Sequence, residues 1–263
     1  MMRTLIMLML CVSLLSACPQ KDQVKDSQEV AAAQSNARQL AEINTKLGIE
    51  YMRQNRNEQA LEKFEKALAA DQTYAPAPGY AALLYERIGR LADAEAAYRR
   101  ALELEPGNAS IRNNFARYLC SHDQFAAAEE NFRQVIDNKL YPTPEIAMVN
   151  AGLCARLEPD LIKAERYFNE ALQANPNFAV ALYELAKLAY VSNDYLQARA
   201  YLQRYFQVAG HSAPSLWLGV RVERALNDPT EVARYAYLLK SRFPDSQETR
   251  LLNESQTDGR NTY

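Results

Sequence analysis

A period of 34 residues is the feature that most constrains the fold of this chain. Four positions recur at this spacing, as the pairs Tyr51 and Tyr85, Ala60 and Ala94, Phe64 and Tyr98, and Ala67 and Ala101. Residues three or four apart share one face of an α-helix, and these positions follow that spacing. A repeat this short cannot bury its apolar face alone, so neighbouring copies must stack into a continuous core. The sequence therefore predicts an all-helical array of stacked units.

The repeat resembles the tetratricopeptide pattern, which has two antiparallel helices in each copy. Gly48 lies on the first helix, where a small residue lets the second helix approach closely. Ala60, Phe64 and Ala67 follow on the second helix in a small-large-small order that lets helices interlock. The resemblance implies a right-handed superhelix whose concave groove is lined by the first helices.

Six copies of the repeat are predicted, over residues 41–74, 75–108, 109–142, 145–178, 179–212 and 213–246. The fourth copy follows a two-residue insertion, and the sixth keeps only a helix-turn-helix pattern. Drift is expected in the last repeat of a solenoid, because one of its faces meets water. We expect the solenoid to span residues 36–250, with its first helix beginning near Asn36, and residues 251–263 to form a flexible tail.

Residues 1–17 have the layout of a signal peptide. Arg3 precedes an apolar run at residues 5–15, which is too short to span a bilayer but has the right length for a signal core. The run ends in the letters LSAC at residues 15–18, which resemble the bacterial lipobox. Cleavage would leave Cys18 as the lipidated first residue of the mature chain. The alternative is an ordinary secretory signal with an accidental cysteine.

The residues around Cys18 indicate where the lipid would hold the protein. Cys11 lies in the apolar core of the signal and has no expected role. Pro19 stands where an aspartate would retain an enterobacterial lipoprotein in the inner membrane, so the sequence resembles one sorted to the outer membrane. Residues 18–35 are predicted to be the lipidated N-terminus and a polar tether. We therefore expect a lipid-anchored protein at the periplasmic face of the outer membrane.

Cys120 and Cys154 lie 34 residues apart on the first helices of the third and fourth copies. First helices of neighbouring copies pack side by side, which brings the two thiols within reach of each other. A periplasmic location is oxidising. We predict a Cys120–Cys154 disulfide that clamps the two copies. The alternative is a pair of buried, unpaired cysteines.

No pattern of catalytic or metal-binding residues is present. His122 and His211 both lie in inter-helix turns, and the chain has no Gly-x-Ser-x-Gly, His-Glu-x-x-His or Gly-rich phosphate loop. A net charge of −2 lacks the basic stripe that nucleic-acid binding requires. We therefore predict no catalytic residues, metal, cofactor, small-molecule substrate or nucleic-acid partner. A hydrolase is a distant alternative, testable by mutating His122 and His211.

A protein-binding groove is the remaining possibility. Its candidate residues, taken from the repeat places that face the groove, are Ile49, Met52, Tyr80, Leu83, Asn114, Arg117, Asn150, Leu153 and Tyr183. The first four form an apolar cluster, which suggests a peptide or strand partner, although packing on a neighbouring helix is an equal alternative. Asn114 and Asn150 share the sixth place, where they bind peptide or bond between repeats. The full carboxylate clamp of chaperone-type repeats is missing, so a C-terminal carboxylate ligand is not expected.

The whole layout resembles one family, the type IV pilus biogenesis and stability lipoproteins, which are pilotins of the pilus secretin. The resemblance rests on LSAC at 15–18, LGIEYMRQNRNEQALEKFEKAL at 47–68 and NNFARYLCSHDQFAAAEENF at 113–132. It implies that the protein binds secretin subunits, carries them to the outer membrane on its lipid and promotes their multimerisation for pilus assembly and twitching motility. A repeat lipoprotein of the β-barrel assembly machinery, or a scaffold for peptidoglycan-synthesis enzymes, shares the same layout.

Overall fold

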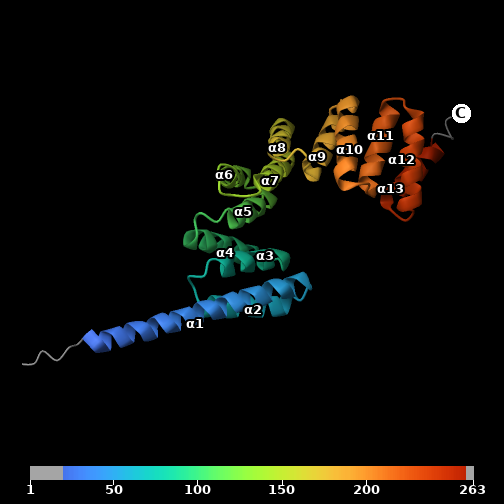
Figure 1. The fold of residues 1–263 in the computed structure, drawn as a ribbon. Coiled ribbons are helices and arrows are strands. Elements are labelled where there is room, and N and C mark those ends of the chain that lie inside the picture. Colours follow the sequence, from blue (N-terminus) through green and yellow to red (C-terminus); the bar gives the residue numbers. More distant parts are fainter. Residues whose placement is uncertain (1–19, 259–263) are drawn as a thin grey trace, which may run out of the picture. The chain divides into compact units, whose positions relative to one another are not determined.

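A computed structural model describes residues 20–258, and all regular elements in that range are α-helices (Figure 1). The first seven are α1 (Gln20–Arg53), α2 (Asn57–Ala70), α3 (Pro76–Arg87), α4 (Leu91–Leu104), α5 (Ala109–Ser121), α6 (Phe125–Ile136) and α7 (Pro144–Leu157). The others are α8 (Leu161–Ala174), α9 (Ala179–Val191), α10 (Tyr195–Ala209), α11 (Ala213–Ala225), α12 (Pro229–Arg242) and α13 (Gln247–Asp258). The predicted signal peptide and Cys18 lie outside the described residues.

The helices α1 to α12 form the six predicted pairs. Each first helix from α3 to α11 begins within one residue of the predicted start of its copy. The paired helices α5 and α6, α7 and α8, α9 and α10, and α11 and α12 pack on each other. The all-helical fold predicted from the 34-residue period is confirmed. The chain divides within α3 into two compact units, residues 1–84 and 85–263.

The predicted start of the first helix near Asn36 is wrong, because α1 already begins at Gln20. Most of the segment predicted as a tether is therefore helical. Residues 20–35 contain no glycine or proline and are rich in Lys, Gln, Glu and Ala, which favour helix. The polarity of this stretch matches the exposure of its side chains, seen from Glu29 to Ser35, and does not prevent a helix from forming.

The predicted end of the solenoid at residue 250 is also wrong, because residue 250 lies inside α13. Leu252 on this helix is fully buried and packs in a cluster with Leu216 of α11 and Leu239 of α12. The Thr249 hydroxyl donates a hydrogen bond to the carbonyl oxygen of Phe243 at 2.8 Å. Residues 251–258 thus belong to the helix that covers the end of the last repeat.

In three copies a glycine on the first helix packs against an aromatic ring 16 positions later on the second helix. A Cβ atom added to Gly48 would lie 2.7 Å from the Phe64 ring. One added to Gly152 would lie 2.5 Å from the Phe168 ring. The third such pair is Gly219 and Tyr235, and the same small-to-large spacing recurs in the sequence at Ala82 and Tyr98, Ala116 and Phe132, and Ala186 and Leu202. All six large residues are at most 2% exposed, so they form a regularly spaced series of core residues.

The turn between the two helices of a copy also follows the period. Asn55, Gly89, Asp123, Asn193 and Asn227 all have φ between 55° and 77°. Glycine adopts this left-handed conformation freely, and Asn and Asp tolerate it better than other residues. The turn residues therefore fix where each first helix ends and its partner begins.

We predict that Gly152→Ala destabilises the fold, because the new methyl group overlaps the Phe168 ring. After allowance for the better helix propensity of alanine, the expected loss is about 1–2 kcal/mol in the free energy of unfolding, measured with urea. Gly107→Ala is the matched control, since nothing lies within 4 Å of a Cβ atom there. Equal stability of the two variants would contradict the packing described for this contact.

Candidate functional site

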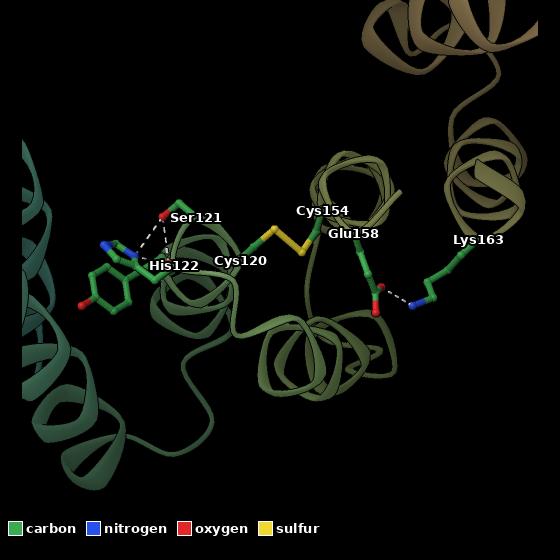
Figure 2. Close-up of a disulfide and its surroundings, with 7 residues drawn as sticks. Cys120, Ser121, His122, Cys154, Glu158 and Lys163 are labelled. Carbon is green, nitrogen blue, oxygen red and sulfur yellow. Dashed lines mark hydrogen bonds and ion pairs between the residues drawn. A yellow bond between two sulfur atoms is a disulfide. The ribbon is translucent and has the colours of Figure 1, made fainter. Parts of the chain in front are cut away.

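Cys120 at the end of α5 and Cys154 on α7 form a disulfide, with their Cα atoms 5.7 Å apart (Figure 2). The helices α5 and α7 pack on each other, as predicted for first helices of neighbouring copies. The pairing is the one predicted from the 34-residue spacing. Because it joins two first helices, it holds the third and fourth repeats together on the side where the groove is expected.

A cavity of about 290 Å³ lies beside this disulfide. Its lining residues are Glu86, Arg117, Cys120, Ser121, Asn150, Leu153, Cys154 and Leu157. Three predicted binding residues, Arg117, Asn150 and Leu153, are thus brought together around one cavity. Glu86, Ser121 and Leu157 were not among the candidate binding residues, although all three occupy groove-facing places of the repeat, the twelfth for Glu86 and the thirteenth for the other two.

The cavity has one carboxylate and one exposed cation in its wall. The Tyr98 hydroxyl donates a hydrogen bond to Glu86. Burial, together with this bond to the Glu86 carboxylate, raises the pKa of Tyr98 well above its ordinary value. Tyr98 therefore stays protonated and holds the Glu86 carboxylate in place. Arg117 is exposed, so its charge is available at the surface of the cavity.

The two asparagines at the sixth place are less accessible than a peptide-binding role requires. Asn150 is half-buried and donates a hydrogen bond through Nδ2 to Oδ1 of the buried Asn113 at 3.1 Å. This bond joins the third and fourth repeats, which favours the alternative that asparagines here bond between repeats. Asn114 is half-buried.

The predicted apolar cluster of the first two repeats is only partly on the surface. Tyr80 is 41% exposed, and Ile49 and Leu83 are half-buried. Met52 is 9% exposed and belongs to the core, so its assignment to a binding surface is wrong. Its place in the repeat faces the groove, but its side chain is covered by the surrounding chain.

Tyr183, the last predicted binding residue, is half-buried on α9. Its ring centroid lies 5.3 Å from that of Tyr205, and the Lys187 ammonium lies 5.3 Å from the Tyr183 ring. Burial raises the pKa of Tyr183. These neighbours cover part of the Tyr183 ring.

Both histidines contact neighbouring protein groups. His122 lies 2.8 Å from the Tyr118 carbonyl oxygen and 3.2 Å from the Ser121 hydroxyl (Figure 2). His211 stacks on Phe206, and burial lowers its pKa, with a further contribution from Arg242. Among residues 29–255, whose side chains the structure describes, no cluster of three or more His, Cys, Asp or Glu is arranged to hold a metal ion. No helix within residues 20–258 has the length and hydropathy needed to cross a bilayer.

Comparison with known proteins assigns the family. Residues 45–109 and 113–177 match one tetratricopeptide-repeat family, and residues 156–217 match a second. The chain is 31% identical over 204 residues to the type IV pilus assembly protein PilF of Pseudomonas aeruginosa, covering 77% of this chain and 80% of that protein. The chain belongs to this family of tetratricopeptide-repeat proteins of type IV pilus biogenesis.

Two solved structures of the family share the fold. The crystal structure of PilW, a widely conserved type IV pilus biogenesis factor, matches with a TM-score of 0.73 and 30% identity. That match covers 81% of this chain and 98% of PilW. Pseudomonas aeruginosa PilF matches with a TM-score of 0.72 and 27% identity, over 84% of this chain and 99% of that one. The protein is thus built as a repeat scaffold of a family associated with pilus biogenesis.

We predict that replacing both cysteines, as Cys120→Ser and Cys154→Ser, destabilises the protein without unfolding it at 25 °C. The disulfide closes a loop of 34 residues, and loop-closure entropy gives an expected loss of about 3–4 kcal/mol. Thermal unfolding of the wild-type protein should show the same loss of stability when reductant is added. Alkylation followed by mass spectrometry of the unreduced mature protein should find neither thiol, and modification of both cysteines would disprove the bond in the native protein.

Proposed function

We propose that this protein is an outer-membrane lipoprotein that binds subunits of the type IV pilus secretin and promotes their localisation and multimerisation there. The observation that carries the proposal is the similarity to PilF, a type IV pilus assembly protein, over most of both chains. The PilW structure is likewise that of a type IV pilus biogenesis factor. A scaffold of stacked helices offers a long surface for one partner and needs no chemistry of its own.

The N-terminal sequence supports the membrane part of the proposal. LSAC at residues 15–18 provides a thiol at Cys18 for lipid attachment. Several acyl chains, each stabilised by about 0.8 kcal/mol for every buried CH₂, anchor a protein firmly at a membrane. Helix α1 begins at Gln20, two residues after Cys18, and its first turns would separate the lipid from the first repeat. The lipid provides the location, and the repeats provide the binding surface.

We predict that Cys18→Ala releases the protein from the outer membrane, because the acceptor of the lipid is lost. Cys11→Ala is the control, since that residue lies inside the signal core and is removed with it. In cells, membrane fractionation should find the Cys11→Ala protein in the outer membrane and the Cys18→Ala protein elsewhere. An unchanged distribution of Cys18→Ala would remove the lipid anchor from the proposal.

We further predict that deletion of the gene abolishes secretin multimers in the outer membrane, and with them piliation and twitching motility, while cells stay viable. The secretin is followed by immunoblotting of outer-membrane fractions on gels that preserve multimers. Normal multimers in the deletion strain would overturn the proposal. Loss of viability with accumulation of unfolded barrel proteins would instead assign the protein to the β-barrel assembly machinery.

A further inference from the structure

The ninth place of the repeat, which faces the groove, holds a cation in three of the later repeats and none in the first two. The ninth place of a copy is Arg117 in the third, Lys187 in the fifth and Arg221 in the sixth. The same place is aliphatic in the first two copies, at Ile49 and Leu83. The fourth copy has its cation one turn later, at Arg156. A row of positive charge therefore runs along α5, α7, α9 and α11 in a chain whose net charge is negative.

A second cavity, of about 220 Å³, lies along this row. Its lining residues are Arg156, Leu161, Lys187, Leu188, Tyr190, Val191, Leu218 and Arg221. Arg156 and Leu157 are consecutive residues at the end of α7, and Leu157 lines the cavity beside the disulfide. The two cavities thus lie on either side of the same helix end. We call them together the basic groove.

The basic groove has more cations than carboxylates: it is lined by Arg117, Arg156, Lys187 and Arg221 on one hand, and by Glu86 and the neighbouring Glu184 on the other. Glu184, 7% exposed, accepts hydrogen bonds from both Arg156 and Lys187, so one carboxylate serves two cations. Arg221 lies 4.3 Å over the Tyr190 ring. Among residues 29–255, whose side chains the structure describes, neither Arg117 nor Arg221 has a carboxylate within 4.0 Å. A bound partner can therefore supply the missing carboxylates.

The carboxylate of Glu158, at the end of α7, does not neutralise these cations. It pairs instead with Lys163 at the start of α8, at 2.5 Å (Figure 2). Lys163 has its pKa raised chiefly by this hydrogen bond. The acidic turn after α7 is thus paired locally, and the excess positive charge of the groove remains.

Large aliphatic side chains line the edge of the same groove. Leu157 and Val191 are each 64% exposed, and Leu161 is 43% exposed. Leu157 and Val191 occupy the thirteenth place of the fourth and fifth copies. In the other copies this place holds Arg53, Arg87, Ser121 and Ala225. Clustered exposed aliphatic side chains mark surfaces that bind other proteins.

We infer that the basic groove binds an extended segment of a partner protein in which carboxylates alternate with aliphatic side chains. Arg117 and Arg221 pair with the carboxylates, and the aliphatic side chains pack on Leu157, Leu161 and Val191. Charge complementarity of this kind sets specificity and the rate of association. The inference rests on the proposed function in one respect, that the natural partner is the secretin subunit.

The test uses the full mature chain and a fluorescein-labelled 12-residue peptide that repeats Glu-Leu-Ser. Peptides repeating Lys-Leu-Ser and Glu-Ser-Ser serve as matched probes, and anisotropy reports binding at 50 and 300 mM NaCl. The Glu-Leu-Ser peptide should bind at least tenfold more tightly than either of the others. Binding should weaken at the higher salt concentration, because ions screen exposed charges.

Variants locate the binding to the groove. Arg117→Glu with Arg221→Glu should weaken binding of the Glu-Leu-Ser peptide at least tenfold, and Leu157→Asn with Val191→Asn at least fivefold. Arg100→Glu is the control, because Arg100 is exposed on α4 and pairs with Glu103 across one helical turn. The affinity of this control variant for the Glu-Leu-Ser peptide should stay within twofold of the wild-type affinity. Circular dichroism checks that every variant keeps its helix content.

Two results would overturn the inference: groove variants that bind as wild type does, or equal or tighter binding of the Lys-Leu-Ser peptide. Tighter binding to vesicles of anionic lipid than to the Glu-Leu-Ser peptide would also overturn it. The proposed function is tested by a separate result. Normal secretin multimers in the deletion strain refute that function whatever the peptides do. If wild type supports secretin assembly and the Arg117→Glu, Arg221→Glu protein supports it equally, the groove is refuted and the function stands.

Discussion

The contact between a small residue on one helix and a large residue 16 positions later is the constraint on which the rest of the structure depends. It is tightest at Gly152, where even a methyl group would overlap the Phe168 ring. The contact fixes how closely the two helices of a copy approach, and its repetition sets where each first helix lies. Because the first helices lie side by side, residues at equal places of successive copies form rows. These rows line the groove.

The disulfide lies at the point where the regular stacking of the repeats is interrupted. The third and fourth copies are separated by the two-residue insertion, which shifts the register between them. Cys120 and Cys154 join the two first helices across that shift, and Asn150 bonds to Asn113 at the same junction. A covalent bond and a polar bond thus hold together the two repeats that share the first cavity. The position of Arg117 relative to Leu157 depends on this junction.

Features set by local periodicity were predictable, and features set by burial were not. The helix pairs, their starts and the cysteine pairing follow from the 34-residue period. The beginning of α1 was missed because a polar stretch was interpreted as a tether, although its residues favour helix. Met52 was placed on the surface because register shows the direction of a side chain but not what covers it. Leu157 and Val191 carried a readable signal, since their place in the repeat holds no large aliphatic residue in the other copies.

The central claim is that this scaffold promotes secretin assembly by binding the subunit directly. The most direct measurement adds purified secretin subunits to outer-membrane lipid vesicles, with and without the lipidated protein, and follows multimer formation by gel and electron microscopy. The account predicts multimers that form faster and in greater yield with the protein present, in proportion to the amount added up to a fixed ratio. Equal rate and yield without the protein would contradict it.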